Sequence, residues 1–346
     1  MSEKKSNPND SPENKQITSQ RKQEHIDICL EEDVEFRKSN GFEKYEFEHQ
    51  ALPELNLSEI DTSIEFFGKT FKFPFFIEAI TGGSPGTERL NQNLARACEE
   101  MGIGMGTGSQ RAMLDEPGVK YTYMVRDVAP NIFLLGNIGA VQLANLHVDD
   151  VIHMVEQIKG DGLAIHLNAA QEMCQPEGDT DWRDVLPNIG RICKHTDFPV
   201  IIKETGCGIA GDIAKRLESA GADCLDIGGA GGTSFTRVEY YRGSESAAAL
   251  AEWGIPTAES LRQCRNTVTI PIIASGGIRS GVDCAKALAM GASLVGFALP
   301  VLKAAQASHQ AVVDKLKSIA EELKRTMLLL GTRNIEELKR IQVIPV

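Results

Sequence analysis

The sequence predicts an α/β fold, a single-domain (β/α)8 TIM barrel, from three observations. Eight short runs of apolar or small residues recur along the chain without clean polar alternation, as is typical of parallel strands buried on both faces. Most gaps between the runs are long enough for an amphipathic helix. The repeat of roughly 30 residues gives about the length of a (β/α)8 barrel. A doubly wound sheet is the alternative fold.

The predicted strands lie at 73–81, 102–108, 131–139, 162–169, 199–204, 224–229, 271–277 and 293–298. Helices are predicted at 87–102, 212–222, 281–292 and in the C-terminal stretch 309–340. The first of these helices carries on one face Leu90, Leu94, Ala97 and Cys98. Gly221 and Gly291 are placed to end the second and third helices.

Composition excludes several classes of protein. The chain has 346 residues, 42% of them hydrophobic, and a net charge of −12, so it can build a large core and has no strong basic block for nucleic acid. No apolar run approaches the ~18 residues of a membrane span, and no secretory signal is visible. The eight scattered cysteines favour a reducing, cytoplasmic location. The polar segment 1–20 predicts a disordered tail ahead of a domain at 21–346.

Glycines gather where the predicted strands end, which is where barrels of this kind hold their active sites. The richest runs are Gly228–Gly232 and the segment 275–281, which leads into a helix. Glycine lets backbone N–H groups approach an anion closely, and a helix N-terminus favours phosphate. The two segments together predict a phosphate site.

Lys203 lies at the end of the fifth predicted strand. Burying a charged lysine there is energetically unfavourable unless it pairs with an acidic group or has a role in binding or catalysis. Three interpretations stay open from the residues alone. It is a structural lysine paired with Glu204 or Asp226, a Schiff-base nucleophile, or a cation beside an electron-rich cofactor ring.

Polar residues also follow the fourth and second predicted strands. His166 and Asn168 share one face of the fourth strand, and Glu172 lies in the loop beyond it. Glu172 is either solvated or a ligand that holds Mg²⁺ together with substrate oxygens. Arg111 follows the second strand, as a fork for phosphate or an ordinary surface arginine.

Near the N-terminus, Arg21 and Lys22 precede His25 and an apolar stretch. Two cations beside a histidine suit an anionic ligand. The alternative interpretation is an ordinary start of a helix.

Taken in order, these motifs resemble the type 2, FMN-dependent isopentenyl-diphosphate isomerases, from Arg21 to about residue 302. The most specific elements are Gly-Ser-Gln-Arg at 108–111 and His-x-Asn-x-x-Gln-Glu at 166–172. The other shared elements are Arg-Lys-x-Glu-His-Ile at 21–26, Thr-Gly-Gly at 81–83, Gly-Asn-Ile-Gly at 136–139, Lys-Glu-x-Gly-x-Gly at 203–208, the glycine-rich run 228–234 and Ser-Gly-Gly-Ile-Arg at 275–279.

The resemblance implies a barrel that binds reduced FMN and interconverts isopentenyl diphosphate and dimethylallyl diphosphate by a 1,3-allylic proton shift. It also implies Mg²⁺ on the diphosphate, NADPH or another reductant for the flavin, and a homotetramer or homo-octamer. Nucleic acid and membrane are not expected partners.

Carried over residue by residue, the resemblance assigns FMN binding to Ala79, Ile80, Thr81, Gly82, Ser109, Asn137, Lys203, Thr233, Gly276, Gly277, Ile278, Arg279, Ala298 and Leu299. It assigns substrate binding to Arg21, Lys22, Ser109, Gln110, Arg111, His166, Asn168 and Gln171. The implied catalytic residues are Gln171, His166 and Lys203, and the implied metal ligand is Glu172.

Two residues depart from the family pattern. Ile80 stands where the family usually has Met, and Glu78 is an unexpected charge in a strand. Three other functions remain under consideration: an FMN-dependent oxidoreductase on the same barrel, an aldolase that uses Lys203, and a flavin-free protein that binds a phosphate ligand.

Overall fold

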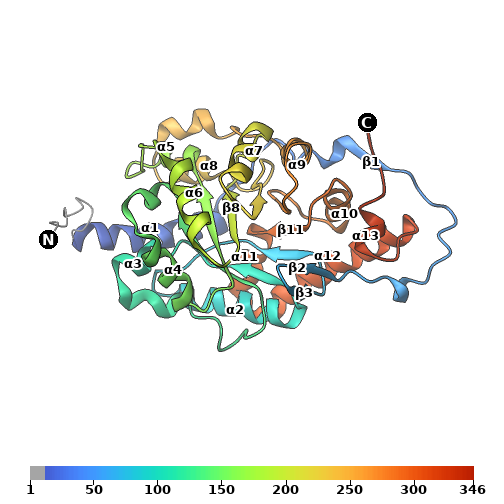
Figure 1. The fold of residues 1–346 in the computed structure, drawn as a ribbon, viewed down its shortest axis with the longest axis horizontal. Coiled ribbons are helices and arrows are strands. Elements are labelled where there is room, and N and C mark those ends of the chain that lie inside the picture. Colours follow the sequence, from blue (N-terminus) through green and yellow to red (C-terminus); the bar gives the residue numbers. More distant parts are fainter. Residues whose placement is uncertain (1–11) are drawn as a thin grey trace.

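A computed structural model describes residues 12–346, with side chains from residue 21 onward. Eight parallel strands form a closed barrel in the order β10-β11-β4-β5-β6-β7-β8-β9, surrounded by helices (Figure 1). The barrel strands are β4 (Phe75–Ile77), β5 (Gly104–Gly106), β6 (Leu134–Gly139), β7 (Gly162–Leu167), β8 (Val200–Glu204), β9 (Cys224–Asp226), β10 (Ile272–Ser275) and β11 (Leu294–Phe297). Each lies within one of the eight predicted runs, so the predicted (β/α)8 barrel is confirmed.

The register of the strands brings their carboxyl ends to one face of the barrel. The ring closes where Val295 of β11 pairs with Phe75 of β4. In the middle of the sheet, His166 of β7 pairs with Gly139 of β6 on one side and with Lys203 of β8 on the other. The polar residues predicted to follow separate strands therefore meet at a single place.

The helices are α1 (Pro12–Glu31), α2 (Thr87–Met101), α3 (Arg111–Asp115), α4 (Val148–Gln157), α5 (Ala169–Cys174), α6 (Val185–His195), α7 (Gly211–Ser219), α8 (Phe235–Tyr241), α9 (Thr257–Arg265), α10 (Gly281–Ala289), α11 (Leu299–Ala307), α12 (His309–Leu329) and α13 (Ile335–Leu338). Short 3-10 helices lie at Phe42–Lys44, Leu57–Glu59, Pro117–Tyr123, Ala140–Asn145 and Glu245–Leu250. The four residues predicted to share a face of α2 are all buried. Gly221 and Gly291 follow α7 and α10 with φ of 100° and 101°, left-handed conformations that suit glycine.

Aromatic side chains close the amino-terminal end of the barrel. The hairpin of β2 (Ile64–Phe66) and β3 (Lys69–Phe71) packs there, with the ring of Phe66 5.7 Å from that of Phe133. Inside, Phe75 and Phe297 meet edge to face at 5.2 Å. Around these aromatic rings, Asp161, immediately before β7, pairs with Lys69 of β3 at 2.8 Å and with Arg126 at 2.5 Å.

The two ends of the chain cover the barrel from outside. The C-terminal helix α12 packs against α2, α10 and α11, and β12 (Val343–Pro345) pairs antiparallel with β1 (Tyr45–Phe47). Helix α1 packs against α3, α8 and α11. The predicted tail boundary at residue 20 falls inside α1, and residues 1–11 lie outside the described residues. No helix in the described part of the chain has the length and apolar character needed to cross a membrane.

Candidate active site

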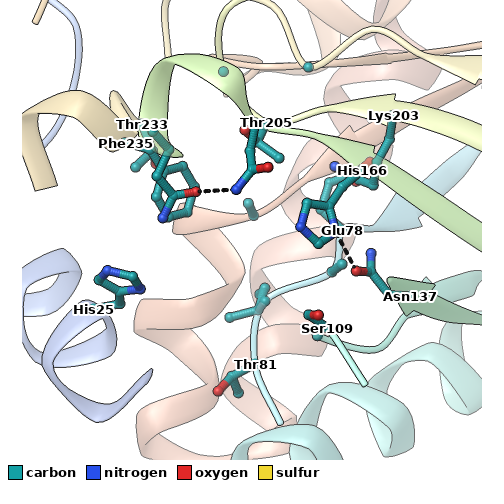
Figure 2. A pocket seen from close by; sticks show the side chains of 18 of the residues that line it. His25, Glu78, Thr81, Ser109, Asn137, His166, Lys203, Thr205, Thr233 and Phe235 are labelled. Carbon is teal, nitrogen blue, oxygen red and sulfur yellow. Dashed lines mark hydrogen bonds and ion pairs between the residues drawn. The ribbon is translucent and has the colours of Figure 1, made fainter. Parts of the chain in front are cut away.

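One pocket opens at the carboxyl ends of the barrel strands, and α1 contributes to its wall. Figure 2 shows His25 of α1 on the opposite side of this pocket from Lys203 and His166. The residues predicted from the sequence that line it are Arg21, Lys22, Ala79, Ile80, Thr81, Gly82, Ser109, Arg111, Asn137, His166, Asn168, Gln171, Glu172, Lys203, Thr233, Gly276, Gly277, Arg279, Ala298 and Leu299.

Two predicted residues do not line the pocket with their side chains. The amide of Gln110 is buried, donating from Nε2 to the Met154 carbonyl at 3.0 Å and accepting at Oε1 from the Asn137 N–H at 3.1 Å. The side chain of Gln110 therefore lies outside the pocket and holds the backbone of Asn137. The side chain of Ile278 is 1% exposed and belongs to the core.

We call Glu78, Lys203, Asp226 and Ser275 the base of the pocket. Lys203 Nζ lies 3.5 Å from Glu78 Oε2 and 3.5 Å from Asp226 Oδ2, and donates to the Glu204 carbonyl at 2.9 Å. Burial on its own lowers the pKa of Lys203, but the carboxyl groups of Asp226 and Glu78 outweigh it and raise that pKa above its usual value. A firmly protonated lysine is a fixed cation, which argues against the Schiff-base interpretation.

His166 stands beside the base as a neutral group. Its Nδ1 lies 2.8 Å from Asn137 Oδ1 (Figure 2). Burial, followed by the charges of Lys203 and Lys22, lowers the pKa of His166 to about 3. Since an amide oxygen accepts, the proton of the neutral ring sits on Nδ1 and Nε2 presents a lone pair.

The loops after β9 and β10 form a glycine cradle on another side of the pocket. Gly276 and Gly277 have φ of 107° and 71°, and a Cβ on them would lie 2.0 Å and 2.2 Å from the carbonyl oxygens of Gly229 and Gly231. Only glycine fits, because the two loops pack backbone to backbone. Arg279 and the start of α11 border the same cradle. Exposed N–H groups, an arginine and a helix N-terminus fit the phosphate of FMN.

We call Arg21, Arg111, Glu172, Glu177 and Asp179 the rim of the pocket. Arg111 Nη1 lies 3.3 Å from Asp179 Oδ2, and Arg21 Nη1 lies 3.7 Å from Glu177 Oε1. Burial lowers the pKa of Arg21, although Glu177 opposes the effect. The rim thus places two guanidinium groups beside three carboxylates. When an anion and a divalent cation enter together, the guanidinium groups can pair with the anion and the carboxylates with the cation.

Glu172 is oriented by two hydrogen bonds. Its Oε1 accepts from Asn168 Nδ2 at 3.0 Å and its Oε2 accepts from the Asp179 N–H at 2.8 Å. A carboxylate has about four lone-pair positions, so one position on each oxygen is still available for a cation. The described residues contain no group of three or more His, Cys, Asp or Glu able to hold a metal by themselves. Mg²⁺ at Glu172 would therefore need oxygens from a ligand or water.

Gln171 belongs to a chain of hydrogen bonds that connects it, through Glu239, to His25 on the wall of the same pocket. Its Oε1 accepts from Asn168 Nδ2 at 3.2 Å, and its Nε2 donates to Glu239 Oε1 at 3.2 Å. Glu239 is fully buried, lies 2.9 Å from His25 Nε2 and pairs with Arg242 at 2.6 Å. These contacts fix the amide of Gln171 in one orientation.

Lys22 links α1 to the loop that follows β4. Its ammonium donates to the carbonyls of Gly82 and Ser109 and to the hydroxyl of Tyr123. Burial, followed by the charge of Arg21, lowers the pKa of Lys22 to about 7. In this structure Lys22 stabilises the wall of the pocket through neutral oxygens.

The chain matches the family of FMN-dependent dehydrogenases over residues 14–116 and 142–344. It is 47% identical to an isopentenyl-diphosphate delta-isomerase of Pyrococcus furiosus, over 94% of this chain and 86% of that protein. It is 45% identical to the isomerase of that name from Methanothermobacter thermautotrophicus, over 95% and 93% of the two chains. The chain belongs to the FMN-dependent isopentenyl-diphosphate isomerases.

Solved structures with the same fold are more distant. A lactate oxidase from Pediococcus acidilactici superposes with a TM-score of 0.68 at 18% identity, covering 96% of this chain and 94% of that one. A mandelate oxidase with an FMN adduct gives 0.62 at 19% identity, over 93% and 92%. At such identities these likenesses establish the barrel and say nothing of the reaction of this family member.

Two carboxyl groups shape the site of this isomerase-family chain in ways that the sequence did not indicate: Glu239 was missed, and Glu204 was considered only as a partner of Lys203. Glu204 Oε2 accepts from the N–H groups of Thr205 and Gly206, both at 2.6 Å, and from those of Cys207 and Gly208, and thereby holds the loop after β8. Burial raises the pKa of Glu204 to about 7, although the hydrogen bonds from these N–H groups act to lower it. The glycines after Glu204 signalled such a turn. Nothing local signalled Glu239, which meets Gln171 only through the fold.

Proposed function

We propose that this protein interconverts isopentenyl diphosphate and dimethylallyl diphosphate with reduced FMN and Mg²⁺. The observation that carries the proposal is the joint presence, in one pocket, of a glycine cradle beside Lys203 and a rim of arginines beside Glu172. Close relatives named for this reaction support it. When bound, reduced FMN supplies a group that gives and takes the proton at carbon.

The base of the pocket would act on the cofactor. Lys203 is a fixed cation, held by Asp226 and Glu78, and it favours negative charge on a neighbouring ring. Thr81, Ser109 and Asn137 supply polar groups along the same wall, and Gly276 with Gly277 would receive the phosphate. Ala79, Ile80, Gly82, Thr233, Ile278, Arg279, Ala298 and Leu299 complete the proposed FMN site.

The rim would act on the diphosphate. Arg21 and Arg111 offer planar forks that can leave Glu177 and Asp179 for phosphate oxygens. Glu172 would hold Mg²⁺ against the same oxygens, because a hard cation prefers carboxylate and phosphate. Several positive groups are needed, since a buried diphosphate without them is strongly disfavoured. Lys22 would add its charge from behind the wall.

Two polar side chains lie between the base and the rim. His166 is neutral, with Nδ1 bonded to Asn137, and it would accept a hydrogen bond at Nε2 from water around the metal. Gln171, held by Asn168 and Glu239, would border the hydrocarbon end of the substrate. Helix α1 would close the pocket over the substrate and exclude water, which an exposed carbanionic or cationic carbon would not survive.

The test is to follow isopentenyl diphosphate by NMR with the purified protein, FMN and Mg²⁺ under anaerobic conditions. Dimethylallyl diphosphate is expected only after the flavin is reduced, with NADPH as the proposed reductant. The matched control is Glu172→Gln, which is expected to keep FMN and lose the Mg²⁺ response. Turnover of a 2-hydroxy acid with reduction of the flavin, and no isomerisation, would instead support an oxidoreductase.

We further propose a cytoplasmic homo-oligomer of four or eight chains.

A further inference from the structure

Glu78 is a buried carboxyl group in the pocket that the proposed function does not explain. It follows β4, its residue is 6% exposed, and neither oxygen has a hydrogen-bond partner among the described residues. The neighbouring strand leaves space for it, because a Cβ on Gly296 would lie 2.1 Å from Glu78 Oε1. The barrel is therefore built around this carboxyl group.

The charges around Glu78 do not balance if every group is ionised. One ammonium, Lys203, lies 3.5 Å from an oxygen of Glu78 and 3.5 Å from an oxygen of Asp226. Two carboxylates against one cation leave a net charge of −1 in a buried place, which is strongly disfavoured. One of the two carboxyl groups should therefore carry a proton.

The hydrogen bonds decide which one. Ser275 Oγ donates to Asp226 Oδ1, while Asp226 Oδ2 faces Lys203, so both oxygens of Asp226 are stabilised as a carboxylate. Glu78 Oε2 faces Lys203 at the same 3.5 Å, but no hydroxyl or backbone N–H among the described residues donates to either of its oxygens. Burial, and next the charge of Asp226, raise the pKa of Glu78 well above its usual range, although Lys203 opposes them.

We propose that Glu78 is a positioning residue that carries a proton in the resting protein, so that the Glu78–Lys203–Asp226 cluster is neutral beneath the cofactor. The inference rests on the FMN site proposed above. A cluster of charge −1 would repel an anionic reduced flavin, whereas a neutral cluster lets the ammonium of Lys203 act on it. When Asp226 cannot ionise, Glu78 can release its proton to the solvent and pair with Lys203 in its place.

Other titratable groups face the cluster, and none balances it. Glu204 offers Lys203 its backbone carbonyl, while its own Oε2 is occupied by the N–H groups of its loop. His166, from the adjacent strand, is neutral at physiological pH because burial lowers its pKa to about 3. A single proton on Glu78 therefore keeps the base neutral.

The test is a double-mutant cycle read by the midpoint potential of bound FMN at pH 7. Glu78→Gln and Asp226→Asn are each expected to change the reduction equilibrium less than about threefold, because the remaining carboxyl group still pairs with Lys203. The double variant is expected to favour reduced FMN by more than tenfold, about 30 mV per factor of ten for a two-electron couple. Additive single effects, or no effect in all three variants, would overturn the proposal.

Infrared spectroscopy of the wild-type protein gives a second readout that needs no stable double variant. At pH 7, Glu204 contributes a C=O band of its own, because its pKa is about 7. A further C=O band of a protonated carboxylic acid is expected at pH 7, with or without FMN, that vanishes in Glu78→Gln but persists in Asp181→Asn, a change at an exposed carboxylate. Absence of that band from the wild type would overturn the proposal. Because the band does not need the flavin, failure of FMN to bind would count against the proposed function alone.

Discussion

The base and the rim of the pocket both combine cations with carboxylates, yet they differ in how firmly these charges are held. At the base, the side chains of Lys203 and Asp226 are 10% and 2% exposed, and both are carried by barrel strands. At the rim, those of Arg111 and Asp179 are 29% and 39% exposed, and they follow the strands in helix and loop. Half-exposed ion pairs contribute only about 0–1 kcal/mol, so they exchange partners easily.

This difference separates two tasks. Charges fixed in strands cannot follow a ligand, but they give a constant field, which suits a resident cofactor. Charges on the rim give up weak partners for strong ones, which suits a diphosphate and its cation. The same residue types therefore serve opposite purposes according to burial.

The largest effect is expected at the base. Lys203→Met should lower kcat by at least about a hundredfold, because it removes the fixed cation beside the proposed flavin, and one preorganised electrostatic group contributes about a hundred- to a thousandfold in kcat. Stopped assays at saturating substrate, with FMN content and circular dichroism measured alongside, would check it. A variant that binds FMN, folds normally and retains kcat within threefold of the wild type would contradict the role of the base as a fixed charge that acts on the cofactor.

A smaller effect is expected for Glu172, the proposed metal ligand at the rim. Glu172→Gln should raise the Mg²⁺ concentration for half-maximal activity by about ten- to a hundredfold and leave bound FMN unchanged, since it removes a hard anionic ligand. The measurement is a Mg²⁺ titration of activity. Asp181→Asn, on an exposed carboxylate paired only with Arg183 among the described side chains, is the matched control. Unchanged Mg²⁺ dependence in Glu172→Gln would place the metal elsewhere.

An arginine of the rim should affect substrate binding more than turnover. Arg111→Gln is expected to raise KM by about tenfold or more, since a hydrogen bond to a charged group contributes about 1.5–3 kcal/mol. Arg183→Gln, at a side chain 85% exposed, should leave KM unchanged. Initial rates at several salt concentrations would check both, because screening weakens an exposed charge contact. Equal kinetics for the two variants would remove Arg111 from the substrate site.

The smallest effect concerns His166 and pH. Its pKa of about 3 in the folded protein lies below that of the unfolded chain, so only the unfolded state takes up a proton as the pH falls from about 6.5. The free energy of unfolding should therefore decrease towards acid pH through this residue, and less so in His166→Gln. Nitrogen NMR should find a neutral ring with the proton on Nδ1 at pH 5. A ring that titrates near 6.5 would contradict the buried environment described here.

Much of this architecture follows from the sequence. Strand runs without alternation predict parallel buried strands, and the repeat length predicts a barrel, so the amino-acid pattern alone assigns residues such as His166 and Lys203 to one face. Composition is a poorer guide to the N-terminal boundary, because residues 12–20 are polar and yet continue α1. Helix α1 therefore begins within the polar segment, ahead of the apolar residues at its C-terminal end.

Side-chain direction and partners are harder to predict. Gln110 lies inside a specific motif, but its amide turns to the backbone of Asn137 because buried polar groups must be satisfied. Glu239 reaches Gln171 across 68 residues of sequence, and no local pattern encodes that distance. Glu78 was visible as an unexpected charge, yet its meaning depends on Lys203 and Asp226 from two other strands.

The central claim is that the base binds FMN and the rim binds a diphosphate in the same pocket. The most direct measurement is an anaerobic flavin spectrum of the purified protein with NADPH and Mg²⁺, before and after addition of isopentenyl diphosphate. The account predicts that oxidised FMN bleaches with NADPH and that the reduced spectrum shifts on addition of substrate as dimethylallyl diphosphate forms. A protein that binds no flavin, or whose reduced flavin spectrum ignores the diphosphate, would contradict it.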